Sequence, residues 1–99
     1  MLYPVRFEPI FKERIWGGTG LREEFGRLLP SDKIGESWEI ACRDDAVSQV
    51  AAGPLRGKSL AELASVYGAK LLGEKIVGGN TFPLLLKILD AREVLSVQV

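Results

Sequence analysis

The clearest alternation of apolar and polar residues lies between positions 34 and 42. Because side chains two residues apart share one face of a strand, this stretch predicts a strand with one mostly apolar face. A glutamate interrupts that face, so the strand carries a carboxylate on its apolar side. The members of the face are Ile34, Glu36, Trp38, Ile40 and Cys42.

A hairpin is predicted after this strand. The polar residues 43–45 predict a turn, and the stretch 47–52 predicts a second strand that ends before Gly53 and Pro54. Glu39 and Ser37 point away from the apolar face, and we expect Glu39 to be solvated.

Short elements are predicted near the N-terminus. Residues 5–8 alternate between two prolines, a pattern typical of a short edge strand. Trp16 followed by Gly17–Gly18 predicts a tight loop at which the backbone approaches another segment closely. Residues 20–25 predict one turn of helix, and residues 28–33 predict a loop.

The best-defined helix is predicted to begin at Ser59. Ser59 and Glu62 have the spacing of a capping box, in which each side chain satisfies a backbone N–H near the helix start. Apolar residues then recur at intervals of three and four as far as Leu72, so one stripe of the helix faces a core. Gly73 is the predicted end, which gives a helical segment at about 59–73.

Two more strands are predicted towards the C-terminus. The run 84–89 predicts a strand buried on both faces, with Lys87 at its centre. Residues 90–93 predict a turn, and residues 94–99 a last strand. Because the chain stops inside that strand, we expect a truncated polypeptide rather than a complete folding unit.

Composition narrows the classes of function. The 99 residues, 46% of them hydrophobic, suit one small domain with an apolar core. The 13 basic residues balance 13 acidic ones, which argues against nucleic acid or a membrane surface as a partner. One cysteine, no secretory signal pattern and no apolar run long enough to span a bilayer favour a cytoplasmic protein.

Histidine is absent, so chemistry in this segment must use other polar side chains. Lys87 is the first candidate, because an ammonium in an apolar run needs a partner or a cavity. The pattern alone favours a lysine that reaches solvent from an edge strand. Glu36 could bind a metal, accept a proton or pair with Lys87, but a frayed strand start explains it more simply.

Other candidates carry weaker signals. Ser96 and Gln98 share a face of the last predicted strand, which suits either the wall of a pocket or an ordinary solvent-facing side. Trp16 beside two glycines is typical of structural packing, although a loop that faces a ligand is an alternative. Cys42 has neither a base nor a second cysteine, so we expect a buried, inert thiol.

The wording and order of these motifs resemble the type I mannose-6-phosphate isomerase family, and the closest likeness is to the shorter bacterial form. The resemblance covers the chain almost from end to end. The matching blocks are Phe7–Gly18 (FEPIFKERIWGG), Gly35–Glu39 (GESWE), Gly53–Leu60 (GPLRGKSL), Phe82–Ala91 (FPLLLKILDA) and Leu95–Val99 (LSVQV).

The resemblance implies a mainly β fold with helical additions, a cupin-like jelly-roll β-sandwich that is incomplete in this chain. It implies interconversion of mannose 6-phosphate and fructose 6-phosphate with a bound zinc ion. Gln98 would be one metal ligand, and Ser96 would contact the substrate phosphate. Lys87 would line the pocket as a proton-transfer or substrate-binding residue, with Glu36 and Trp16 nearby.

The family motif continues with a histidine beyond Val99, and the remaining metal and phosphate ligands would also lie beyond it. We therefore expect this chain alone neither to retain zinc nor to turn over substrate. The alternative is a non-catalytic cupin-like module that binds sugar or another chain. Open sheet edges also predict self-association.

Overall fold

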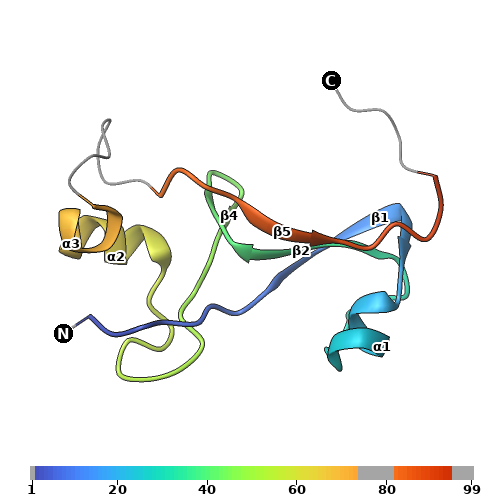
Figure 1. Ribbon diagram of the computed structural model, residues 1–99, viewed down its shortest axis with the longest axis horizontal. Helices are drawn as coiled ribbons and strands as arrows, with labels where there is room; N and C mark the ends of the chain where they lie inside the picture. Colours follow the sequence, from blue (N-terminus) through green and yellow to red (C-terminus); the bar gives the residue numbers. More distant parts are fainter. Residues whose placement is uncertain (1, 74–81, 95–99) are drawn as a thin grey trace. The chain divides into compact units, whose positions relative to one another are not determined.

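The computed structural model describes residues 2–73 and 82–94 (Figure 1). The chain divides into two compact units. The first comprises the residues up to Pro9 and Glu39–Leu86, and the second comprises Ile10–Trp38 and the residues from Lys87 onward. Strands in antiparallel pairs and a few short helices make up the described elements, so the fold is mainly β with helical additions.

The second unit is built on a sheet with the strand order β1-β2-β5, visible side by side in Figure 1. Strands β1 (Ile10–Gly18) and β2 (Ile34–Ile40) are antiparallel, and Lys12 lies opposite Glu36. The predicted strand from position 34 is confirmed, although it ends at Ile40. The short helix α1 (Gly20–Phe25) is also confirmed.

Irregular pairing between β1 and β2 explains the glycines after Trp16. The register shifts between Lys12 and Glu13 and again before Gly18. A Cβ atom on Gly17 would lie 2.5 Å from the carbonyl carbon of Ile34, closer than atoms can approach. The predicted close approach is confirmed, but the predicted loop is wrong, because both glycines belong to β1 and neither has a positive φ.

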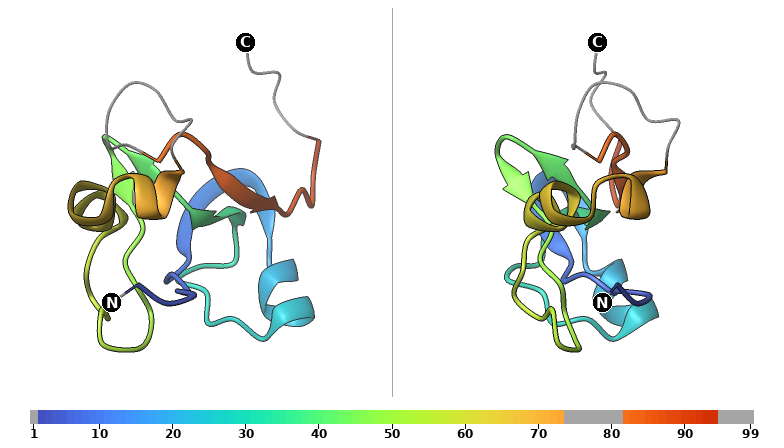
Figure 2. Two further views of the ribbon diagram at one scale, coloured as in Figure 1. Left: turned by 60° about the vertical axis from the view of Figure 1, so that its left-hand side comes forward. Right: turned by 90° about the vertical axis from the view of Figure 1, so that its left-hand side faces the viewer.

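The first unit contains the helices α2 (Leu60–Tyr67) and α3 (Ala69–Leu72) (Figure 2). The capping box at Ser59 is present, and Leu60, Leu63 and Ala64 of the predicted apolar stripe are buried. The later members of the stripe, from Tyr67 to Leu72, are half-buried. The predicted helix is interrupted at Gly68, whose backbone is not helical, and Gly73 caps the end of α3.

The predicted hairpin is shorter than expected. It pairs β3 (Cys42–Arg43) with β4 (Ala46–Val47) around a two-residue turn. The predicted strand over 47–52 is wrong beyond Val47, because the buried Ser48 hydroxyl accepts a hydrogen bond from the Ala41 N–H and the following residues form only isolated bridges. One of these joins Val50 to Phe7 in antiparallel pairing, so the predicted N-terminal edge strand is reduced to a single bridge with its flanking backbone hydrogen bonds.

Strand β5 (Leu86–Leu89) is shorter and more exposed than predicted. Leu86 and Leu89 are 45% and 51% exposed, so the expectation of burial on both faces is wrong. The apolar run alone does not reveal what covers a strand. In the described part of the chain, no helix is long and apolar enough to cross a membrane.

Candidate active site

The buried carboxylate of Glu36 is the centre of the candidate site. Only 4% of this residue is exposed, so the interpretation as a frayed strand start is wrong. The reason is the position of β2, which lies between β1 and β5 in the sheet and is flanked on both sides. A buried charge of this kind is stable only when it is paired and hydrogen-bonded.

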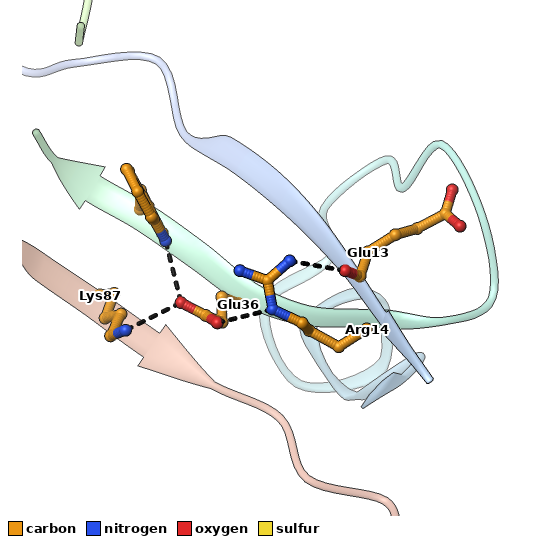
Figure 3. A network of polar contacts seen from close by, with 5 residues as sticks. Glu13, Arg14, Glu36 and Lys87 are labelled. Carbon is orange, nitrogen blue, oxygen red and sulfur yellow. Dashed lines mark hydrogen bonds and ion pairs between the residues drawn. The ribbon is translucent and has the colours of Figure 1, made fainter. Parts of the chain in front are cut away.

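Three donors from three strands satisfy the carboxylate (Figure 3). Lys87 Nζ on β5 donates to Oε1 over 2.9 Å, and the Trp38 indole N–H donates to the same oxygen over 3.0 Å. Arg14 Nε on β1 donates to Oε2 over 2.9 Å. These four residues, Glu36, Lys87, Trp38 and Arg14, are called the Glu36 cluster below.

Opposing effects act on the ionisation of Glu36. Burial raises the pKa of the Glu36 carboxyl, but the hydrogen bonds from Lys87 and Trp38 and the positive charges of Arg14 and Lys87 lower it. The lowering effects prevail, and the pKa of Glu36 lies below its ordinary value of 4.5. Glu36 is therefore an anion at neutral pH, and it faces two cations in the cluster.

Lys87 is the member of the cluster best placed to meet a ligand. Its side chain is 37% exposed, whereas that of Glu36 is 5% exposed. An ammonium group has three N–H donors, and one of them is directed at Glu36. Lys87 can therefore keep its ion pair and still donate a hydrogen bond to an oxygen of a bound molecule.

Arg14 and Trp38 are held in turn by their own contacts. Arg14 Nη1 donates to the backbone carbonyl of Glu13 over 2.7 Å. The ammonium of Lys12 lies 4.5 Å from the centre of the Trp38 ring, a cation–π contact. Sequence reasoning missed Arg14, because the irregular register of β1 decides which side chains of that strand reach Glu36. It placed Trp38 on the same face as Glu36 but did not foresee the hydrogen bond from the indole N–H.

Trp16 lies in the same unit but is not among the three residues described above that donate hydrogen bonds to the Glu36 carboxylate. Its side chain is buried, and a Cβ atom added to Gly35 would lie 2.6 Å from its ring. Its backbone carbonyl accepts hydrogen bonds from the N–H groups of Arg92 and Glu93. These observations describe packing, and the substrate-binding role of Trp16 stays a prediction.

Several other expectations meet the structure differently. Glu39, which was expected to be solvated, is half-buried. Ser37, on the same side of the strand, is fully buried, and its hydroxyl accepts a hydrogen bond from Arg27 Nη1 over 2.8 Å. Cys42 is half-buried, so the expectation of a buried thiol is wrong. Ser96 and Gln98, with the predicted strand 94–99 beyond its first residue, lie outside the described residues.

A metal site does not arise from the described residues alone. Among residues 2–73 and 82–94, no group of three Cys, Asp or Glu side chains is close enough to hold a metal ion. Both oxygens of Glu36 already accept hydrogen bonds from protein donors. The described residues therefore do not fit a zinc ion, which generally takes three or four protein ligands.

Comparisons with known proteins assign the family. The model of the type I phosphomannose isomerase catalytic domain matches residues 5–99. The chain belongs to this family. It is 47% identical over 96 residues to mannose-6-phosphate isomerase ManA of Bacillus subtilis and 41% identical over 99 residues to a mannose-6-phosphate isomerase of Streptococcus mutans.

The structural match agrees with the sequence match. A crystal structure of the mannose 6-phosphate isomerase from Bacillus subtilis is 44% identical, with a TM-score of 0.79 over 91% of this chain and 28% of that one. The fold is therefore the cupin-type β fold with helical additions that the sequence predicted. The match to ManA covers 97% of this chain and 29% of ManA. The match to the Streptococcus mutans relative covers 100% of this chain and 30% of that protein.

Proposed function

We propose that the polypeptide carrying this chain is a mannose-6-phosphate isomerase and that the Glu36 cluster forms part of its sugar-phosphate pocket. The observation that carries the proposal is the ion pair of Lys87 with the buried Glu36 in a member of the type I family. An ammonium fixed at the surface of a sheet suits recognition of an oxygen-rich anion. The single cysteine supports a reducing compartment, and we place the activity in the cytoplasm.

The proposed reaction interconverts mannose 6-phosphate and fructose 6-phosphate. One proton leaves C2 of the aldose and one is added at C1, while a hydroxyl proton moves from the C2 oxygen to the C1 oxygen. Charge develops on these oxygens as the protons move, so a fixed hydrogen-bond donor stabilises the transition state more than the ground state. We assign this role to Lys87.

The remaining assignments rest on the family resemblance. Ser96 is the proposed contact to the substrate phosphate, and Glu36 and Trp16 line the same region. Gln98 is the proposed metal ligand. Zinc enters the proposal only through the resemblance, so no step of the reaction is derived from it.

The direct test transfers this chain into a complete relative. In the chimaera, residues 1–99 replace the matching N-terminal segment of Bacillus subtilis ManA, which aligns with 97% of this chain. We expect the chimaera to convert mannose 6-phosphate into fructose 6-phosphate with a kcat/KM within about tenfold of ManA. Binding of sugar phosphate without turnover would instead support the non-catalytic module.

The chain by itself is expected to lack both zinc and activity. Isothermal titration calorimetry with zinc chloride should show no binding tighter than about 1 mM, because a single amide oxygen is a poor zinc site. An isomerase assay on the same sample should show no turnover. Tight zinc binding or clear turnover by residues 1–99 would contradict this part of the proposal.

A further inference from the structure

We propose that Glu36 is a positioning residue that holds the ammonium of Lys87 in place, while Arg14 and Trp38 hold the carboxylate of Glu36. The inference rests on the proposed function, because it assumes that Lys87 acts on the sugar phosphate. It assigns Glu36 a role through Lys87 rather than a contact with substrate.

The first argument is the occupancy of the carboxylate. Two carboxylate oxygens offer about four acceptor sites, and Lys87, Trp38 and Arg14 take three of them. A substrate hydroxyl could bind Glu36 strongly only by displacing one of these donors. With 4% of the residue exposed, little of Glu36 is open to a ligand.

The second argument is the order imposed on Lys87. A lysine side chain has four rotatable bonds, and an exposed one samples many rotamers. The ion pair with Glu36 fixes the far end of the chain, and Arg14 and Trp38 prevent the carboxylate from rotating with it. A donor fixed before substrate arrives contributes more to catalysis than a mobile one.

The third argument is the charge of the cluster. Glu36 alone would neutralise Lys87, but Arg14 supplies a second positive charge to the same carboxylate. The three charged groups therefore sum to one net positive charge. Arg14 lets Glu36 anchor the lysine without cancelling its attraction for an anionic substrate.

A double-mutant cycle in the ManA chimaera tests the inference. Glu36→Gln should lower kcat/KM about 10- to 100-fold, since the loss of a fixed geometry has effects of this size. In the Lys87→Met background, Glu36→Gln should lower kcat/KM further by less than about twofold, because residues that act as a unit are not additive. Glu24→Gln, the same change at an exposed position of α1, is the matched control. Equal losses in both backgrounds, or no loss from Glu36→Gln, would overturn the inference.

A chemical readout on the 99-residue chain does not depend on activity. The rate of Lys87 acetylation by an amine-reactive ester, followed by peptide mass spectrometry, should rise at least about threefold in Glu36→Gln relative to the exposed Lys70 of the same sample. The Glu24→Gln variant should leave this ratio unchanged. An unchanged ratio in Glu36→Gln would show that the carboxylate does not hold the ammonium.

The two readouts separate the inference from the proposed function. An inactive parent chimaera would contradict the proposed function, and the acetylation ratio would then decide the anchoring of Lys87 alone. If Glu36→Gln fails to fold by circular dichroism, Glu36→Asp replaces it, since it keeps the charge but withdraws the carboxylate by one methylene. We expect Glu36→Asp to give an intermediate acetylation ratio, and a ratio equal to that of the parent would contradict the inference.

Discussion

Burial and pairing have opposite effects on the pKa of the Glu36 carboxyl. Burial raises the pKa of its carboxyl, but donors from three strands favour the anion and leave the pKa below 4.5. Because the folded state prefers the ionised form more than the unfolded chain does, this carboxylate stabilises the fold above the ordinary pKa. That stability is lost as the pH falls through the lower, folded-state pKa.

The pH dependence of stability tests this balance. Glu36→Gln should lower the free energy of unfolding by about 2 kcal/mol at pH 7, the scale of hydrogen bonds to a charged group. The difference from the parent should shrink as the pH falls below the ordinary carboxyl pKa of 4.5, where the unfolded carboxyl gains its proton. Urea unfolding at several values between pH 7 and pH 3 measures it, with Glu24→Gln as control. A difference that stays constant with pH would show that the charge of Glu36 contributes nothing.

The identity of the Glu36 cluster could be predicted from the sequence only in part. The alternation around Glu36 placed a carboxylate on an apolar face, and the run around Lys87 indicated an ammonium in need of a partner. The ion pair of Glu36 with Lys87 joins residues 51 positions apart in the sequence. Arg14 lies in the part of β1 where the register with β2 is irregular. Such contacts depend on strand pairing, which the alternation of a single strand does not specify.

Among the elements, local signals proved the most informative. The start of α2 depends on contacts within four residues, since the Ser59 hydroxyl accepts from the Glu62 N–H over 3.1 Å and the Glu62 carboxylate accepts from the Ser59 N–H over 3.3 Å. The strand predicted over 47–52 ends at Val47, because the hydroxyl of buried Ser48 takes the Ala41 N–H and the residues after it pair with two different segments in isolated bridges. The alternation of apolar residues over 47–52 is compatible both with a continuous strand and with a strand that ends at Val47.

The capping box gives a prediction at this scale. Ser59→Ala should reduce the free energy of unfolding by about 1 kcal/mol, because it leaves the Glu62 N–H without its acceptor. Ser65→Ala, the same substitution at an exposed position inside α2, should change it by less than about 0.5 kcal/mol. Urea denaturation of both variants, followed by far-ultraviolet circular dichroism, makes the comparison. Equal effects of the two substitutions would argue against a stabilising cap.

For the whole molecule, the main observation is that this chain covers less than a third of the length of its relatives. The chain matches 28–30% of the length of its relatives, while apolar side chains at Leu28, Leu89 and Val94 are more than half exposed. The sequence predicted this family from the order of its motifs, which no single strand or helix could have specified. It could not predict the exposure of β5, because an apolar run records a tendency to leave water and not the presence of a cover.

Exposed apolar residues and an open edge strand lead us to expect self-association of the 99-residue chain. Multi-angle light scattering at increasing protein concentration should give an apparent mass above the 10.9 kDa of the monomer. Leu89→Lys, which adds a charge to β5, should shift the equilibrium towards monomer. A monomer at all concentrations would contradict the expectation.

The central claim is that Lys87 acts on the sugar phosphate from a sheet in which Glu36 anchors it. The steady-state kinetics of the ManA chimaera carrying Lys87→Met test this claim most directly, with Lys70→Met as the matched control on α3. We predict a loss of kcat/KM of at least about 100-fold for Lys87→Met and a change of less than about twofold for the control. Full activity in Lys87→Met would contradict the account.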